Sequence, residues 1–263
     1  MGDAMIKVND FVTRNSYNND MLFRVIKIED DICYLKGVNV RLIADASVND
    51  LKKETDIDID DSLYLERIDN KVKNLDRNEY FYLPGKILHI DADKDYLNRC
   101  KAYYDKANLM SMGICEKEDV VPSKIMDYLN EYNPNILVIT GHDAYYKKRG
   151  SANDLDNYKN SIYFVESIKE ARRYEHSHDK LIIIAGACQS NYEELIRAGA
   201  NFASSPKRIN IHALDPAIIA TMMSLSDINK NIDLKEILNS TKYKEDGMGG
   251  IITKGTMYMG YPR

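Results

Sequence analysis

The sequence predicts an α/β fold, a three-layer sandwich with a mostly parallel sheet, preceded by a small β-barrel. Two observations predict the sandwich. Short runs without charge, such as ILVIT at 136–140 and LIIIA at 181–185, alternate with longer segments of helical periodicity. Strands that are buried on both faces read as unbroken apolar runs, and alternation with helices implies parallel pairing. The barrel is predicted by four apolar runs within the first 47 residues.

The predicted barrel covers residues 1–47 and resembles an SH3-like fold in size and strand content. Its turns are predicted at Asn18–Asp20 and Asp30–Asp31, because Asn and Asp favour tight turns. The four apolar runs span 5–14, 22–31, 31–37 and 38–47. A segment this small predicts a binding or packing role rather than chemistry.

Residues 48–83 change in composition, because both charge signs become dense. This pattern predicts a solvated linker that is partly helical. Its acidic stretch contains Asp56, Asp58, Asp60 and Asp61, but it lacks the glycine and the closing glutamate of a calcium loop. We therefore expect a solvated surface there and not a metal site.

Residues 84–263 are the predicted α/β domain, in which apolar strands alternate with amphipathic helices. Strands are expected at 86–90, 109–115, 136–140 and 181–185, and helices at 95–107, 122–132, 158–174 and 191–198. In a doubly wound sheet the active groups lie beyond the carboxyl ends of the strands. The strand ends are therefore the places to search for functional residues.

Composition excludes several function classes. The net charge of −5 does not favour nucleic acid or an anionic membrane as a partner. No apolar run is long enough to cross a bilayer, and no signal-peptide core is expected at the N-terminus. The four cysteines form no C-x-x-C pair, which argues against zinc and redox dithiol sites and favours a reducing compartment. We expect neither a metal nor a cofactor.

Two of the apolar strands end in chemically capable residues. The run at 136–140 leads into His142, and the run at 181–185 leads into Cys188. Adjacent parallel strands lie about 4.8 Å apart, so the two side chains are expected at one edge of the sheet. A free cysteine has a pKa of about 8.5 and needs a base to attack an amide, which a nearby histidine supplies. The pair predicts a catalytic dyad.

The residues around the pair supply candidates for orienting it or for an oxyanion hole. Gly141 and Asp143 flank the histidine, and Gly186 and Gln189 flank the thiol. The stretch 190–193 has the S-x-x-E pattern of a capping box, which predicts a helix start just after the thiol.

The order of the two residues resembles that of caspase-type peptidases. Their signature is Q-A-C-[RQG]-G, with the histidine about 50 residues upstream. Here the stretch at 186–190 is G-A-C-Q-S, so Ala187, Cys188 and Gln189 match and the flanking residues do not. The sandwich is therefore expected to be caspase-like or flavodoxin-like.

A rival pair combines Cys188 with His212 as the alternative base. The histidine then follows the cysteine, as in glutamine amidotransferases. The stretch GACQS at 186–190 also resembles the nucleophile elbow of those enzymes. Asp215 lies three residues further on and is a candidate for orienting a histidine or for binding a basic substrate residue. An aspartate before proline is more often a turn or a cap.

Three long stretches resemble the YabG peptidase family of spore-forming bacteria: NILVITGHDAYYKKRG, IIIAGACQSNYEELIRAGANFASSPKRINIHALDP and DFVTRNSYNNDMLFRVIKIEDD. The resemblance implies a cysteine peptidase that processes proteins of the spore coat and related spore proteins, chiefly after arginine. It also implies action in the mother-cell cytoplasm and at the forming spore coat. The family's histidine and cysteine fall on His142 and Cys188.

The function classes that remain open are an endopeptidase, an amidotransferase-like acyl-transfer enzyme and a non-catalytic scaffold for coat assembly. The expected partners are protein substrates of the spore coat and cortex, with no nucleic acid or membrane, and the oligomeric state stays open. The basic stretch Lys147–Gly150 is an additional candidate for self-processing, because it follows the histidine loop and contains arginine.

Overall fold

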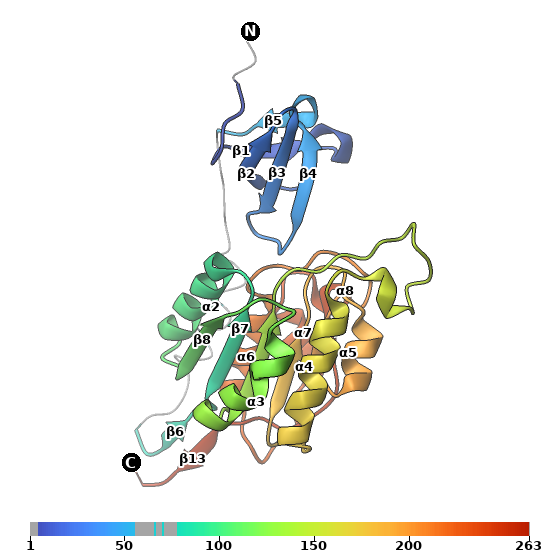
Figure 1. Cartoon of the computed structure of the whole chain (residues 1–263). Coiled ribbons are helices and arrows are strands. Elements are labelled where there is room, and N and C mark those ends of the chain that lie inside the picture. The colour runs from blue at the N-terminus through green and yellow to red at the C-terminus, as the bar shows by residue number, and fades with distance from the viewer. Residues whose placement is uncertain (1–4, 56–65, 67–69, 71–77, 263) are drawn as a thin grey trace. The chain divides into compact units, whose positions relative to one another are not determined.

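The computed structural model of the chain describes residues 5–55, 66, 70 and 78–262 (Figure 1). The chain divides into two compact units, Met1–Asp61 and Ser62–Arg263. The acidic stretch at Asp56–Asp61 and most of the expected linker helix lie outside the described residues.

The first unit contains a five-stranded antiparallel sheet with the order β4-β3-β2-β1-β5. Alternate apolar side chains, including Val12, Phe23 and Leu35, form its core. The strands are β1 (Phe11–Arg14), β2 (Phe23–Glu29), β3 (Ile32–Gly37), β4 (Ile43–Ser47) and β5 (Leu51–Lys53). The antiparallel sheet is confirmed, and its closure into an SH3-like barrel stays a prediction.

The turns of this sheet occur where the sequence predicts them. Asn18 and Asn19 lie between β1 and β2 with φ of 54°, and Asp30 lies between β2 and β3 with φ of 50°. Asparagine and aspartate adopt this left-handed conformation more readily than other non-glycine residues. β5 pairs with β1 although it falls within the stretch 48–83 that composition assigns to a linker.

The second unit contains a six-stranded sheet with the order β12-β11-β10-β9-β7-β8. All neighbours pair in parallel except β12, which is antiparallel to β11. The strands are β7 (Ile87–Asp91), β8 (Ser111–Cys115), β9 (Ile136–Thr140), β10 (Ile182–Ala185), β11 (Phe202–Ser204) and β12 (Met248–Gly250). A separate two-stranded ribbon pairs β6 (Phe81–Leu83) with β13 (Tyr258–Gly260).

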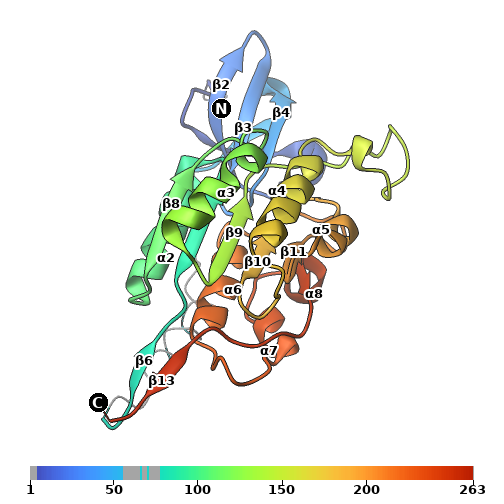
Figure 2. The same cartoon turned by 60° about the horizontal axis from the view of Figure 1, so that its bottom comes forward.

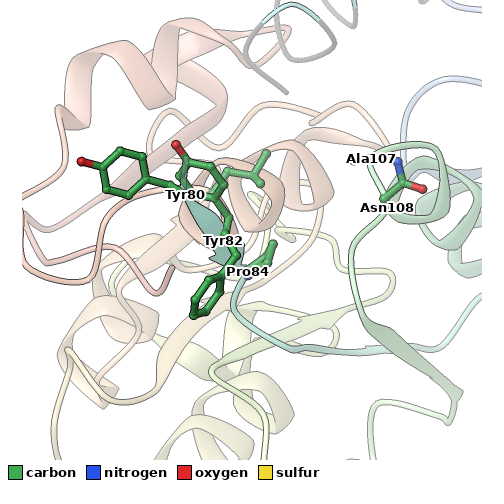
Figure 3. Close-up of a pocket in the computed structure, with 7 residues that line it drawn as sticks. Tyr80, Tyr82, Pro84, Ala107 and Asn108 are labelled. Carbon is green, nitrogen blue, oxygen red and sulfur yellow. The ribbon is translucent and has the colours of Figure 1, made fainter. Parts of the chain in front are cut away.

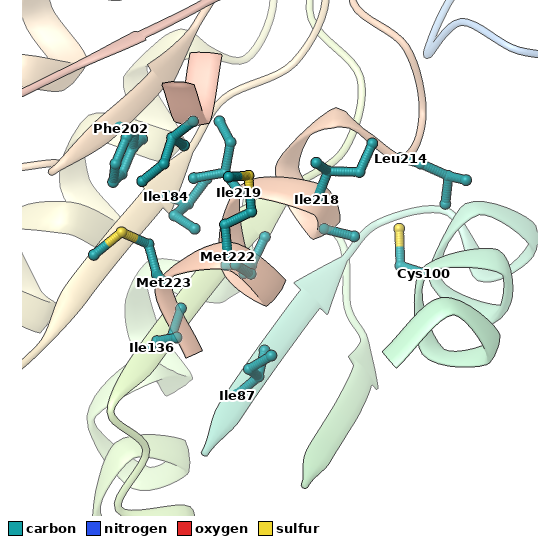
Figure 4. Packing of buried hydrophobic residues seen from close by; sticks show 14 of the residues in the cluster. Ile87, Cys100, Ile136, Ile184, Phe202, Leu214, Ile218, Ile219, Met222 and Met223 are labelled. Atoms are coloured by element: carbon teal, nitrogen blue, oxygen red, sulfur yellow. The ribbon is translucent and has the colours of Figure 1, made fainter. Parts of the chain in front are cut away.

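Helices cover both faces of the six-stranded sheet, so the unit has three layers (Figure 2). One face packs against α3 (Val121–Tyr132), α4 (Ser161–Tyr174) and α5 (Tyr192–Ala198). The other face packs against α2 (Lys94–Lys106), α6 (Asp215–Ser224) and α7 (Leu234–Asn239). Figure 4 shows Ile218, Ile219 and Met222 of α6 packed against the sheet.

The predicted elements of this unit agree with the structure to within a few residues as far as α5. The later elements α6, α7, α8 (Lys244–Gly247), β11 and β12 were not predicted. Every residue of α6 is buried, so it has no polar face and no helical periodicity of apolar residues. Periodicity cannot identify a helix of this kind.

The strand order places a topological switch point between β7 and β9, because β8 lies outside β7 and the later strands extend the other way. In open α/β sheets the ligand crevice forms beyond the carboxyl ends of the strands at such a point. None of the described helices is both long and apolar enough to span a bilayer.

Candidate active site

His142 lies two residues beyond β9, at the switch point. Its Nε2 is 3.2 Å from Oδ2 of Asp93, the residue that precedes α2. Its backbone N–H donates to Oε1 of Glu118 at 2.7 Å, and the ring of Tyr96 meets its ring edge-on. Within the described part of the chain, the buried Nδ1 of His142 has no hydrogen-bond partner. The imidazole ring is thus bonded to Asp93 through Nε2, and its Nδ1 makes no hydrogen bond to a described residue.

Cys188 lies three residues beyond β10 and is fully buried. Its Sγ accepts a hydrogen bond from the N–H of Ile211 at 3.3 Å and lies 3.8 Å from the carbonyl oxygen of Ile211. The backbone of residue 211 therefore lies directly against the sulfur.

The parallel register aligns the two predicted dyad residues along the chain. Ile139 of β9 pairs with Ala185 of β10, so His142 and Cys188 each lie three residues beyond a paired position. Among the residues that the structure describes, no hydrogen bond joins the thiol to the imidazole. The fold brings the two strand ends together, and their direct contact stays a prediction.

Asp143 joins the histidine loop to the cysteine loop. This buried carboxylate accepts hydrogen bonds from the hydroxyls of Ser161 at 2.5 Å and Ser190 at 2.9 Å. It also accepts from the backbone N–H groups of Ala144 and Asn160, each at 2.8 Å. Burial raises the pKa of Asp143, and the four donors act in the opposite direction. Its carboxylate positions the loops and is not bonded to His142.

The helix after the thiol begins differently from the sequence prediction. Asn191 is its N-cap and accepts from the N–H of Glu194. Ser190, the expected cap, instead donates to Asp143 and accepts from the N–H of Ala187 at 2.9 Å. The capping-box prediction was wrong because a buried carboxylate competes for the serine hydroxyl.

Other groups approach both glycines at the strand ends closely. A Cβ at Gly141 would lie 2.5 Å from Oε1 of Glu118. Gly186 has φ of 107°, and a Cβ there would lie 2.3 Å from Oγ of Ser204. Glycine adopts this backbone conformation without strain. Both positions thus serve the packing of the strand ends.

The backbone N–H groups near the dyad differ in their engagement. The N–H of Gly186 donates to the carbonyl of Ile139, and that of Gln189 donates to the carbonyl of Ile209 and to Oγ of Ser205. Within the described ranges, neither the N–H of Gly141 nor that of Asp143 makes a hydrogen bond to the protein. Gly141 and Asp143 are thus the two predicted oxyanion candidates whose N–H groups have no acceptor among the described residues.

His212, the alternative base, lies next to the residue that touches the thiol. It is buried, and its Nδ1 accepts from the N–H of Leu214 at 3.2 Å. Asp215 is fully buried and accepts from the N–H groups of His212 at 3.1 Å and Lys242 at 2.8 Å. Burial raises the pKa of Asp215 to about 6, partly offset by the nearby imidazole of His212. These contacts hold the start of α6, and a substrate role for Asp215 stays a prediction.

Replacing Asp215 with asparagine is expected to make stability less sensitive to pH. The folded pKa of about 6 exceeds the ordinary 3.8, so the folded state binds the proton more tightly and the parent protein loses stability as pH rises through this window. The loss amounts to at most about 3 kcal/mol. Denaturant unfolding of both proteins at about pH 4 and pH 7 measures it. An equal pH dependence in the two proteins would contradict the expectation.

A buried polar network under the site was not predicted. His89 contacts the hydroxyl of Tyr104 through Nδ1 at 2.9 Å and that of Thr140 through Nε2 at 2.8 Å. Thr140 in turn donates to Oδ2 of Asp91 at 2.7 Å. The sequence signal is the H-x-D-x-D stretch at 89–93, which begins within β7 and ends just before α2, where an aspartate typically caps a helix. Asp93 does cap α2, and it also contacts His142.

One pocket, of about 230 Å³, lies at the opposite end of the sheet (Figure 3). It is lined by residues 80–82, by Pro84 just before β7, and by Ala107 and Asn108 at the end of α2. The 13 residues of α2 span about 20 Å, and Asp93 precedes their first residue. The pocket is therefore separate from the candidate site. In the described ranges, no group of three or more His, Cys, Asp or Glu side chains is placed to hold a metal ion.

Comparison with known proteins identifies the family. The sequence pattern of the family described as YabG peptidase U57 matches residues 7–262. The chain belongs to the YabG peptidase family. The sporulation-specific protease YabG of Bacillus subtilis (strain 168) is 42% identical over 283 aligned positions, which cover 97% of this chain and 98% of that protein. The match includes both structural units, and the resemblance seen in the three sequence stretches is confirmed.

Membership in this family supports peptidase activity for the chain, with proteins as substrates. The name of the Bacillus subtilis relative connects that protein with sporulation.

Proposed function

We propose that this YabG-family chain is a cysteine endopeptidase of sporulating cells, with Cys188 as nucleophile and His142 as general base. Its proposed substrates are proteins of the spore coat and related spore proteins, cleaved after arginine or lysine. The proposed places of action are the mother-cell cytoplasm and the forming coat. The observation that supports the dyad is the β9–β10 register. Ile139 pairs with Ala185, and His142 and Cys188 each follow their paired residue by three positions.

The reaction uses the unengaged nitrogen of His142. Nδ1 takes the proton of the thiol, and the sulfur attacks the scissile carbonyl carbon. The proton then passes to the departing amine as the carbon–nitrogen bond breaks, which leaves a thioester on Cys188. Water, deprotonated by the same imidazole, attacks the thioester and releases the acid product and the thiol. The N–H of Asp143 is the proposed donor to the oxyanion.

The thiol must become accessible for this reaction. Cys188 is fully buried, and the backbone of Ile211 donates to its sulfur. We therefore propose that the segment around residue 211 moves away from the sulfur when a substrate binds. Substrate-coupled loop movements of this kind are common in enzymes.

A panel of fluorogenic peptides with Arg, Lys, Asp or Gln at the cleavage position tests the proposed function. Cleavage of the Arg and Lys peptides that iodoacetamide abolishes is the expected result. If neither these peptides nor spore-coat proteins are cleaved in a thiol-sensitive way, the peptidase proposal fails and the scaffold hypothesis is favoured.

Self-processing is expected in the segment Lys147–Gly150. These residues are exposed and follow the histidine loop, and the guanidinium of Arg149 lies 4.1 Å from the ring centroid of Tyr146. The purified parent protein is expected to show two fragments, formed by hydrolysis after a basic residue of this segment, whose masses sum to that of the intact chain plus one water. Intact-mass measurement of the parent and of Cys188→Ala checks this, and a parent that is as uncleaved as Cys188→Ala would remove the proposal.

The amidotransferase-like alternative has one supporting observation. His212 directly follows Ile211, whose backbone contacts the sulfur. A glutaminase assay separates the alternatives, because hydrolysis of glutamine without hydrolysis of any peptide would favour the acyl-transfer enzyme.

A further inference from the structure

The two carboxylate oxygens of Asp93 have different partners. Oδ1 accepts from the N–H groups of Asp95 at 2.9 Å and Tyr96 at 3.3 Å, which caps the start of α2. Oδ2 lies 3.2 Å from Nε2 of His142. Side chains of Asp93 and His142 are only 12% and 17% exposed, so the contact is largely shielded from water. One residue thus joins the helix to the imidazole.

The backbone of Asp93 is held in place by Asp91, the last residue of β7. Its backbone N–H donates to Oδ1 of Asp91 at 2.9 Å. Asp91 is fully buried and accepts the hydroxyl proton of Thr140 through its other oxygen. Thr140 continues the network to His89. A side chain supported in this way has little freedom to turn, which is what orientation of a second side chain requires.

From these contacts we infer that Asp93 is the positioning residue of the catalytic histidine and determines which ring nitrogen acts as the base. This inference rests on the proposed function. An ionised carboxylate can only accept a hydrogen bond, so Nε2 of His142 carries the proton. In the neutral ring Nδ1 is then the acceptor, and it is the nitrogen without a described partner. Asp93 also stabilises the imidazolium that forms when Nδ1 takes the thiol proton.

The other groups around His142 do not duplicate this role. The carboxylate of Glu118 accepts from the backbone N–H and not from the ring. Tyr96 contacts the ring edge-on, with 5.8 Å between the ring centroids. The neighbouring carboxylate of Asp143 is bonded to Ser161 and Ser190. Among the described hydrogen bonds, the one to Asp93 is the only one that the ring makes.

Asp93→Asn and Asp93→Ser separate positioning from capping. Both residues cap helices about as well as aspartate, so thermal unfolding should stay close to that of the parent. The asparagine amide can donate to Nε2 and so place the imidazole proton on Nδ1, which is the wrong tautomer. We expect kcat to fall about 10²- to 10⁴-fold for Asp93→Asn with KM changed less than about threefold. Serine is too short to reach the ring, and a loss of about tenfold or more is expected.

The assay uses the full chain and a fluorogenic peptide with arginine at the cleavage position. The rate at which iodoacetamide alkylates Cys188, followed by peptide mass mapping to separate it from the exposed Cys115, is the second readout. It should be slower in Asp93→Asn than in the parent. Asp233 caps α7 through the N–H of Glu236, so Asp233→Asn and Asp233→Ser are matched capping controls expected to keep full activity.

A role in capping alone predicts the opposite pattern. The inference would be overturned if the asparagine and serine variants kept the parental kcat and alkylation rate. In that outcome only Asp93→Ala would show a lower unfolding temperature and a lower activity. Failure of the proposed function is distinguishable, because in that case Cys188→Ala and His142→Ala would keep full activity as well.

Discussion

Cys188→Ala is expected to abolish peptide hydrolysis, by a factor of at least about 10⁴, without unfolding the chain. Without the sulfur there is no nucleophile and no thioester. The substitution removes one buried atom beside Ile211, so the unfolding temperature should change by only a few degrees. Hydrolysis of the fluorogenic arginine peptide and thermal unfolding measure the two effects.

The companion substitutions identify the base. His142→Ala should reduce kcat by a similar factor with an intact fold, because the thiol loses its proton acceptor. His212→Ala should keep kcat per folded molecule within about tenfold, although it loses a buried contact to Leu214. His176 is exposed, and His176→Ala is the matched control with unchanged activity and stability.

The pattern of the histidine variants decides between the dyads. Full activity in His142→Ala with an inactive His212→Ala would transfer the role of base to His212. Parental activity in Cys188→Ala would exclude thiol catalysis by this site altogether.

Asp143→Ala is expected to destabilise the second unit by about 3–5 kcal/mol at neutral pH. The substitution leaves the hydroxyls of Ser161 and Ser190 and the N–H groups of Ala144 and Asn160 without their acceptor. Because these donors lie in or near the two catalytic loops and α4, activity should fall with stability. Denaturant unfolding followed by a signal from the second unit measures the free energy.

Asp154→Ala is the control for this prediction. Asp154 is exposed and accepts one hydrogen bond, from the N–H of Asp156 at 3.1 Å, so its loss should cost about 1 kcal/mol or less. Equal destabilisation by the two substitutions would show that the Asp143 network contributes little to the fold.

The parallel core and the strand ends could be predicted because their signals are local. Strands β9 and β10 are unbroken apolar runs, and polar residues follow each one. Periodicity also predicts α3 and α4, since each has one apolar face against the sheet. The fully buried α6 has no such pattern, and the short strands β11 and β12 contain too few residues to show one.

The candidate site was predicted in its residue types and only partly in its contacts. His142 and Cys188 follow their strands as expected. The sequence gives no sign that Asp93 contacts His142, because its position just after β7 does not reveal that β9 lies next to this strand. The order β9-β7-β8 is a property of the sheet, and it brings Asp93 within reach of a histidine 49 residues away.

By itself the sequence determined the layered α/β core and which strand ends carry a thiol and an imidazole. Burial and periodicity produce patterns among residues that are close together in the sequence, and such patterns can be recognised without a structure. Only the tertiary structure decided that Asp93 holds the imidazole, that Asp143 joins the two loops and that the backbone of Ile211 lies against the sulfur. Such contacts join residues far apart in the chain. They depend on strand order and on competition for buried hydrogen-bond partners, and neither leaves a local pattern.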